Sequence, residues 1–268
     1  MYGTILGDII GSPYAFDHSK KSKDFKLFNS YSEYTGDTIL AVATGEALLD
    51  AGKEASEKQI YDYVTKSLRK WGNNYLDVEY DMRFRFWLSS KEPQPYNSYG
   101  NDVAVRAAAA GWLYDSVERT REAARISVAV THSHIEGSKG AEAVASAVFL
   151  ARKKHSKSAI KQYMESEFQY DLSRTCDEIR PMYSYQEACQ KTVPEAVTAF
   201  LEGKDFEDVL RIAISLGGDC NTVGAIAGSI AEAYYEIPSE LKDKCENYLP
   251  ADVKAVLLRF DKIIQKCR

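Results

Sequence analysis

The chain has 268 residues, of which 45% are hydrophobic and 27% charged, with a formal net charge of −5. This composition predicts one folded domain over residues 1–268 and argues against disorder. The acidic balance gives no nucleic-acid signal, because phosphate binding requires clustered basic side chains. We expect no membrane partner, since there is neither a basic leader before an apolar stretch nor an apolar run of about 18 residues. The cysteines lack metal or disulfide spacing, which favours the reducing cytoplasm. No pattern indicates an oligomeric state.

Helical periodicity dominates the chain. Apolar side chains recur at three- and four-residue spacing over residues 38–50, and Gly52 follows as a stop. A capping box at residues 56–59 opens a helix that runs to about residue 71. Further helices are expected over residues 103–115, 120–131, 138–153, 158–169, 194–202, 205–216, 222–235 and 251–265. Pro194 occupies the place of a first helical residue. Strand-like alternation does not recur, so we predict an all-α domain.

The least regular stretches cover residues 11–36, 72–101 and 170–192. They are rich in Tyr, Asn, Ser and Gly, and segments this long inside a compact domain usually have a functional role. Their aromatic content predicts packed walls of a pocket.

Two distant loops each place oxygen-bearing side chains just before an apolar helix. The first contains Thr35 and Asp37, and the second contains Asp219, Asn221 and Thr222. Hard cations such as Mg²⁺ prefer clustered oxygen ligands, so these residues are the candidate metal ligands. The simpler alternative is that each loop only caps the helix that follows it. The glycine pair before Asp219 favours the first interpretation, because it allows a close backbone approach to a ligand.

Three more loops are candidates for ligand contact: residues 7–13, 98–102 and 131–140. Two histidines near residue 133 do not form a zinc set, because no further His or Cys completes one. For the last loop, a turn that ends a helix remains the alternative. The candidate substrate-binding residues come from these loops and from the glycine pair before Asp219. They are Asp8, Gly11, Gly100, Asn101, Asp102, His132, Ser133, Gly137 and Gly218.

Taken together, the loops resemble the ADP-ribosylglycohydrolase family, of the dinitrogenase-reductase-activating glycohydrolase type. The resemblance runs from Gly3 to about Tyr235 and rests on motifs in the same order. These are Gly-Asp-Ile-Ile-Gly-Ser-Pro from residue 7, Ser-Tyr-Gly-Asn from residue 98, His-Ser-His-Ile-Glu-Gly from residue 132, Val-Pro-Glu-Ala from residue 193 and Ser-Leu-Gly-Gly-Asp from residue 215.

The resemblance implies an all-α orthogonal bundle with a central cleft. It also implies ADP-ribose, an ADP-ribosylated substrate or a related nucleotide as the ligand, and Mg²⁺ as the cofactor. In such proteins, two Mg²⁺ ions are held by a Thr-Asp-Asp-Thr segment and by a later Asp-x-Asp-Thr segment, and a Glu contributes to catalysis. Carried over, the carboxylates expected to take part in catalysis are Asp37 and Asp219, with Asp102 as a replacement carboxylate.

The sequence departs from the family pattern at the site itself. Gly36 and Asn221 stand where the family has Asp, Ala15 stands where it has Glu, and Asp102 stands where it usually has Gly. Two dications about 3.5–4 Å apart would then face half the usual negative charge. We therefore expect weakened binding of Mg²⁺, at one or two sites, with at most one ion held well. The alternative for Asp102 is a helix N-cap.

Hydrolysis of the glycosidic bond passes through an oxocarbenium-like state, and loss of an acid or base group costs about 10²–10⁴-fold in rate. The favoured prediction is a protein that binds ADP-ribose with hydrolysis weakened or lost. An active Mg²⁺-dependent hydrolase with a remodelled site is the alternative. The sequence does not distinguish natural substitutions from engineered ones.

Overall fold

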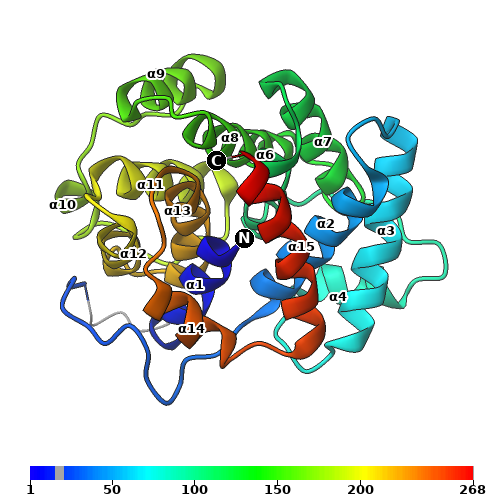
Figure 1. Cartoon of the computed structure of the whole chain (residues 1–268), viewed down its shortest axis with the longest axis horizontal. Helices are drawn as coiled ribbons and strands as arrows, with labels where there is room; N and C mark the ends of the chain where they lie inside the picture. The colour runs from blue at the N-terminus through cyan, green and yellow to red at the C-terminus, as the bar shows by residue number, and fades with distance from the viewer. Residues whose placement is uncertain (16–20, 268) are drawn as a thin grey trace.

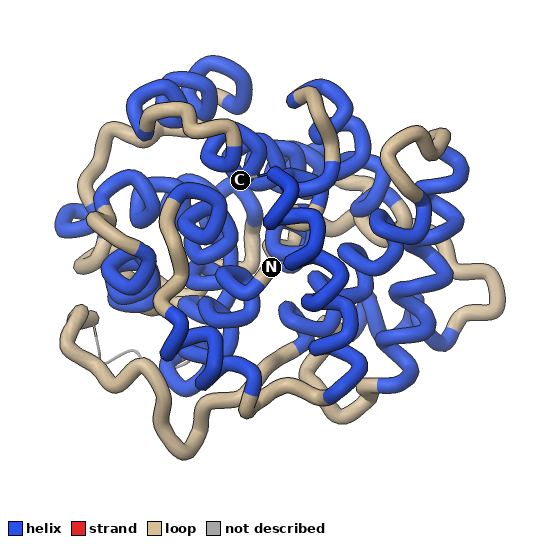
Figure 2. The backbone as a smooth tube through the Cα atoms, viewed as in Figure 1, coloured by secondary structure: helices blue, strands red, loops and turns tan. Residues whose placement is uncertain are grey.

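The computed structural model describes residues 1–15 and 21–267, and its regular structure is helical throughout (Figure 1 and Figure 2). The first half contains α1 (Tyr2–Gly11), the short 3₁₀ helix η1 (Ser12–Tyr14), α2 (Gly36–Ala51), α3 (Glu57–Asn74), α4 (Met82–Ser89), α5 (Asp102–Ala107), α6 (Ala110–Leu113) and α7 (Val117–Ala129). The second half contains α8 (Ile135–Arg152), α9 (Lys157–Phe168), α10 (Cys176–Ile179), α11 (Cys189–Glu202), α12 (Phe206–Ser215), α13 (Cys220–Tyr234), α14 (Ser239–Glu246) and α15 (Ala251–Cys267).

The prediction of an all-α fold is confirmed. Over residues 1–15 and 21–267, the β-type pairings are isolated bridges from Tyr96 to His132 and from Gly100 to Ala188. In the same residues, no helix combines the length and apolarity that crossing a bilayer requires.

Helix ends follow the local chemistry that the sequence indicates. The Ser56 hydroxyl accepts from the Gln59 backbone N–H at 3.3 Å, and the Gln59 side chain accepts from the Ser56 backbone N–H at 2.8 Å. This reciprocal pair forms the predicted capping box of α3. Gly52 ends α2 with a φ of 81°, a left-handed conformation that favours glycine.

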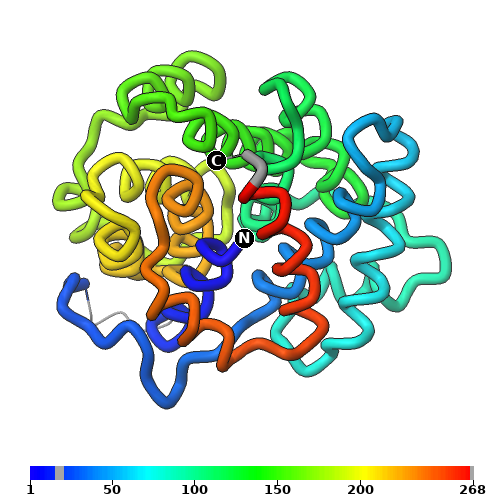
Figure 3. Tube along the Cα trace, viewed as in Figure 1, coloured from blue at the N-terminus to red at the C-terminus, as the bar shows by residue number. Residues whose placement is uncertain are grey.

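Helix α13 forms the centre of the fold. Its residues from Cys220 to Ala233 are all buried, and α1, α8, α11 and α12 pack around it, as Figure 3 shows for α1. A helix that is apolar or small on every side belongs in the core of a protein. Its first turn therefore cannot move without shifting its neighbours, so the side chains at its N-terminus are held in place.

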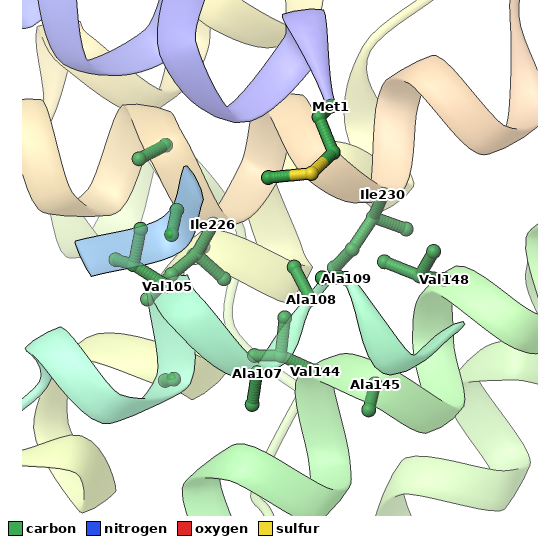
Figure 4. Packing of buried hydrophobic residues seen from close by; sticks show 14 of the residues in the cluster. Met1, Val105, Ala107, Ala108, Ala109, Val144, Ala145, Val148, Ile226 and Ile230 are labelled. Carbon is green, nitrogen blue, oxygen red and sulfur yellow. The ribbon is translucent and has the colours of Figure 1, made fainter. Parts of the chain in front are cut away.

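Small side chains allow the core helices to approach one another closely. Figure 4 shows Ala108 and Ala109 beside Ile230 of α13, with Val148 of α8 nearby. On α6, a Cβ at Gly111 would lie 2.5 Å from the Cβ of Val148. The packing at this level leaves no room for larger residues.

The prediction of a loop over residues 7–13 is wrong, because the whole segment belongs to α1 and η1. A Cβ at Gly3 would lie 2.1 Å from the carbonyl oxygen of Gly228, and one at Gly7 would lie 2.1 Å from that of Gly224. These glycines are spaced one helical turn apart and let the backbones of α1 and α13 touch. Their role is close packing, and they do not terminate a helix.

Three further predictions need correction. The helix expected over residues 103–115 is divided into α5 and α6, and the irregular stretch 72–101 contains α4. Pro194 lies inside α11, which begins at Cys189, and is not a first helical residue. The sequence analysis also did not predict α14, a short and mainly polar helix.

Candidate functional site

The two oxygen-bearing loops meet in space, as the sequence predicts. Thr35 is the N-cap of α2, and its side chain accepts from the backbone N–H of Asp37 at 3.2 Å. The Thr222 hydroxyl, from the first turn of α13, donates to Asp37 Oδ2 at 2.6 Å. Segments 185 residues apart therefore share one hydrogen-bonded cluster. The capping interpretation holds for Thr35, whereas Asp219 makes no side-chain capping bond to α13.

Asp8 lies beneath this cluster and is completely buried. Its Oδ2 accepts from the backbone N–H of Thr35 at 2.8 Å and from the N–H and hydroxyl of Thr38 at 3.2 and 2.6 Å. Its Oδ1 accepts from the Thr35 hydroxyl at 2.8 Å and from the Asn221 side-chain amide at 3.2 Å. The carboxylate is thus satisfied by protein donors, and the side chain has no surface left for the predicted substrate contact.

The aspartates of the cluster disfavour one another's ionisation. Burial raises the pKa of Asp37 well above its usual value, and the charges of Asp8 and Asp219 raise it further. Burial also raises the pKa of Asp8, against the hydrogen bonds from Thr38, Thr35 and Asn221. For Asp219, burial raises the pKa to about 6, although hydrogen bonds from Asn101 and Thr222 lower it. Protons or a cation would relieve this repulsion.

The predicted metal ligands do not fit an arrangement of two divalent cations. In residues 1–15 and 21–267, no group of three or more His, Cys, Asp or Glu side chains is placed to hold a metal ion. Asp37 and Asp219 remain as carboxylate donors, and Thr35 and Thr222 offer hydroxyls. The Asn221 amide nitrogen is turned toward Asp8. The donor set supplies too little negative charge for two cations in a partly buried site.

Gly36 is enclosed by the segment before α4. A Cβ at this position would lie 2.4 Å from the carbonyl oxygen of Glu79 and 3.0 Å from the Tyr80 ring. Backbone atoms cannot swing aside as the end of a flexible side chain can. The structure therefore excludes a carboxylate at position 36 unless residues 79 and 80 move.

The predicted loop at residues 98–102 joins the same cluster. The side-chain amide of Asn101 donates to Asp219 Oδ2 at 2.7 Å, and its backbone N–H donates to the carbonyl oxygen of Glu187 at 2.8 Å. The backbone N–H of Gly100 donates to the Ser98 hydroxyl at 3.1 Å. Asn101 consequently ties the loop both to α13 and to the segment before α11.

Asp102 begins α5, whose N-cap is Asn101, so the alternative that Asp102 is itself the N-cap is wrong. Its Oδ1 lies 3.3 Å from His132 Nε2, and its Oδ2 lies 3.9 Å from Arg106 Nε. Burial opposes ionisation of this carboxyl, but His132 and Arg106 outweigh it and lower its pKa. His132 is only 1% exposed and is held on its other ring nitrogen by Thr131 at 2.9 Å. His132 thus acts as a partner of Asp102 inside the protein.

The remaining predicted contacts fall into different environments. Ser133 is exposed, and its backbone N–H donates to the carbonyl oxygen of Tyr96. Gly137 is buried in the first turn of α8, so the turn expected there starts a helix. A Cβ at Gly11 would lie 2.4 Å from Asn221 Cα, which makes Gly11 a packing residue. Gly218 has a φ of 67°, and a Cβ there would lie 2.7 Å from the carbonyl oxygen of Ser184.

Comparisons with known proteins identify the family of the chain. The model of the ADP-ribosylglycohydrolase family matches residues 1–267. The chain belongs to the ADP-ribosylglycohydrolase family. It is 28% identical to human ADP-ribosylhydrolase ARH3, over 98% of this chain and 92% of that protein. It is 30% identical to the mouse protein of the same name, over 94% of this chain and 88% of the mouse protein.

A solved structure described as an ADP-ribosylglycohydrolase-related protein complex has the same fold. The two chains superpose with a TM-score of 0.72 at 21% identity, over 98% of this chain and 95% of the other. The all-α architecture is therefore that of the family. At this level of identity, the likeness extends to the fold alone.

In this family member, the wall of the site includes residues that sequence reasoning did not single out. Gln186 and Glu187 accept hydrogen bonds from Asn101 through their backbone carbonyls, and the backbone N–H of Cys189 donates to the carbonyl oxygen of Tyr99 at 2.9 Å. Backbone groups make these contacts, so no side-chain pattern indicates them. The aromatic content of residues 170–192 was the available signal.

Proposed function

We propose that this chain binds ADP-ribose, an ADP-ribosylated substrate or a related nucleotide in the cleft where α2, α5 and α13 begin. We further propose that its hydrolysis of the ADP-ribosyl bond is weakened or lost. Family membership supports the ligand class, and the motif order supports the dinitrogenase-reductase-activating glycohydrolase type.

The surroundings of the cluster support retained binding. Asn101 links the Gly100 loop to Asp219, and Tyr96 pairs with His132, so the loops that carry the family resemblance are held together. Helix N-termini attract anionic groups, because their free N–H groups and dipoles carry partial positive charge. The start of α13, where no side chain caps the helix, supplies such N–H groups beside Asp219.

One observation carries the proposal of weakened hydrolysis: side chains and backbone groups of the protein already occupy the positions around the aspartates where metal ions would need free oxygen ligands. Asn221, at a position where the family has Asp, donates its amide to Asp8 at 3.2 Å. Gly36, at the other such position, packs against the carbonyl oxygen of Glu79. Ala15 stands in place of the family Glu and brings no acid or base. We propose that Mg²⁺ binds weakly, at no more than one site, and that turnover falls with it.

An active Mg²⁺-dependent hydrolase with a remodelled site is the second candidate. The observation that favours it is the retained pair of carboxylates, since Thr222 holds Asp37 beside the first turn of α13, where Asp219 lies. Asp102 is close enough to raise the pKa of Asp37 and would supply a further carboxylate.

A release assay separates the two candidates. ADP-ribose release is measured from ADP-ribosylated arginine, serine, protein and DNA, with Mg²⁺ or with EDTA, and human ADP-ribosylhydrolase ARH3 serves as the active reference. We expect calorimetric binding of ADP-ribose together with release at least about 10²-fold slower than the reference. Metal-dependent release at the reference rate contradicts the proposal and favours the second candidate. Absence of ADP-ribose binding contradicts both.

A further inference from the structure

The Asp102 carboxylate lies beside the aspartate cluster and is held by partners of its own. It follows Asn101, whose side-chain amide donates to Asp219 at 2.7 Å. Burial and the neighbouring aspartates raise the pKa of Asp37, and the charge of Asp102 adds to this effect. Helix α5, which begins at Asp102, packs against α2 and α13, the two helices that begin at the cluster. Asp102 therefore belongs to the candidate site.

A chain of buried groups holds this carboxylate from inside the protein. The Thr131 hydroxyl accepts from Arg106 Nη2 and lies 2.9 Å from His132 Nδ1, so it can donate to this nitrogen. In that arrangement, His132 Nε2 carries the ring proton and faces Asp102 Oδ1 at 3.3 Å. Arg106 and Thr131 are completely buried, and the His132 side chain is 2% exposed, whereas that of Asp102 is 28% exposed. Of these four residues, Asp102 is the one that a ligand can reach.

Gly100 leaves space beside the carboxylate. A Cβ at Gly100 would lie 3.0 Å from Asp102 Oδ1. It would also lie 3.3 Å from both His132 Nε2 and Ser98 Oγ. A side chain at position 100 would therefore crowd the carboxylate and the groups that flank it. Because Gly100 is half-buried and has no side chain, a ligand atom is able to approach Asp102 along this side of the loop.

The chemistry of the carboxylate defines what it can bind. Although burial opposes ionisation of Asp102, His132 and Arg106 outweigh it and lower its pKa, so the group is ionised at neutral pH. An ionised carboxylate accepts hydrogen bonds and cannot donate them. It repels the diphosphate of ADP-ribose and attracts the hydroxyl groups of its sugars. Dinucleotide-binding folds recognise an unmodified ribose in this way, through one Asp or Glu that accepts from a hydroxyl.

The place of Asp102 in the site favours the terminal ribose over the adenosine ribose. The bond that joins the terminal ribose to its acceptor is the one cleaved by a glycohydrolase, and Asp37 and Asp219 are the carboxylates expected at that bond. Asp102 lies beside both of them. The donor set of the cluster does not fit two divalent cations, so the hydroxyls of this sugar need acceptors from the protein itself.

We propose that Asp102 is a specificity-determining residue, whose carboxylate accepts hydrogen bonds from the hydroxyls of the terminal ribose and orients this sugar without a metal ion. The inference rests on the proposed function, since it assigns a role inside the nucleotide site. It goes beyond that function by naming the part of the ligand that the site selects and the residue that selects it.

Calorimetric titration of the full chain in EDTA tests the proposal, with ADP-ribose and with ADP, which lacks the terminal ribose. We expect ADP-ribose to bind roughly tenfold more tightly than ADP. ADP also carries more negative charge, so the change in each affinity in variants of Asp102 decides the cause of the preference. Removing a negative charge favours any anionic ligand, whereas removing a sugar acceptor weakens binding of ADP-ribose alone.

The variants give opposite signs for the two explanations. Asp102→Ala should weaken ADP-ribose binding roughly tenfold and leave ADP binding equal or slightly tighter. Asp102→Asn keeps one neutral acceptor and should weaken ADP-ribose binding by about three- to fivefold. Because Asp102→Asn preserves the shape of the side chain, it tests the proposal even if Asp102→Ala does not fold. Glu187→Gln is the matched control, since its carboxylate also acts on Asp219 but accepts from the Tyr185 hydroxyl at 3.0 Å. It should change both affinities in the same direction and by less than about threefold.

The outcomes separate this inference from the function on which it rests. Tighter binding of both ligands to Asp102→Asn, or an equal loss of both, overturns the role of Asp102 while nucleotide binding stands. Equal affinity of the unmodified chain for ADP-ribose and ADP does the same. Absence of binding of either ligand to the unmodified chain overturns the proposed function, and this inference with it.

Discussion

The aspartate cluster and the pocket between the first turns of α8 and α11 differ in how their buried polar atoms are hydrogen-bonded. In the cluster, Asp8 receives hydrogen bonds from Thr35, Thr38 and Asn221. In the walls of the pocket, Glu136 Oε2, Tyr170 Oη, Gln190 Oε1 and Glu195 Oε2 are buried and have no hydrogen-bond partner within the described residues. A buried acceptor that receives hydrogen bonds is compensated for its lost hydration, whereas one that receives none is not. The cluster is therefore stabilised by its own hydrogen bonds, and the walls of the pocket are not.

The largest expected effect comes from removing the central acceptor of the cluster. Asp8→Ala leaves the buried donors of Thr35, Thr38 and Asn221 unpaired, so we expect a loss of about 3–5 kcal/mol in the free energy of unfolding. Urea denaturation measures this loss. Asp62→Ala, which removes an exposed partner of Lys58, is the control and should cost less than about 1 kcal/mol. Equal effects of the two variants would contradict the view that Asp8 organises the cluster.

The next effect tests whether the protein can still accommodate a metal-binding side chain at position 36. Gly36→Asp places a Cβ 2.4 Å from the carbonyl oxygen of Glu79. We expect a loss of about 1–3 kcal/mol in thermal or urea unfolding, because the backbone of the facing segment has to shift. Gly36→Ala should lose a similar amount, since the clash begins at Cβ. If Gly36→Asp retains full stability and gains tight binding of Mg²⁺, then residues 79 and 80 do leave room for a carboxylate at position 36. That result would contradict the view that the cluster has lost its metal position.

A smaller effect depends on pH. The folded protein holds the pKa of Asp219 at about 6, above the usual 3.8, chiefly through burial. A raised pKa means that the native state gains stability from the proton below about pH 4 and loses it as the pH rises through about 6. Asp219→Asn should therefore stabilise the chain by roughly 1–3 kcal/mol near pH 7.5 in EDTA, with the gain disappearing near pH 4.

Melting curves of both proteins across this pH range measure the difference. The new Asn side chain at position 219 keeps an oxygen that can accept the hydrogen bond from Asn101. The substitution therefore removes the charge and leaves this hydrogen bond in place. A gain that is constant with pH, or one that grows toward acid, would show that titration of this group does not matter for stability.

The smallest effect concerns the Tyr170 hydroxyl in the wall of the pocket between α8 and α11. The Tyr170 hydroxyl is buried and without a partner in the described chain, so Tyr170→Phe should change the unfolding free energy by less than about 0.5 kcal/mol or raise it slightly. Thermal unfolding of both proteins without added ligand provides the measurement. A large loss would show that the hydroxyl has a hydrogen-bond partner inside the protein and would contradict the comparison with the cluster.

The sequence predicted the parts of the fold that depend on local pattern. Periodic apolar residues and caps identified α2 and α3, and oxygen-bearing residues before apolar helices identified the Asp37 and Asp219 loops. The convergence of these loops is confirmed by the hydrogen bond from Thr222 to Asp37. The family resemblance supplied the global arrangement, which local patterns alone do not determine.

Other features depended on contacts that no local pattern carries. Gly7 and Gly11 suggested a loop, because a glycine that permits a turn is indistinguishable in sequence from one that permits helix contact. The wall made by Gln186 and Glu187 acts through backbone carbonyls, which every residue possesses. The burial of Asp8 and the closure around Gly36 emerge only once distant segments are packed together.

Titration of ADP-ribose in EDTA and then in saturating Mg²⁺ tests the central claim most directly. We predict that ADP-ribose binds in both conditions, with affinities that differ by less than roughly tenfold, and that Mg²⁺ titrated alone shows at most one weak site. Two tight Mg²⁺ sites, with ADP-ribose bound only after they are filled, would contradict the account.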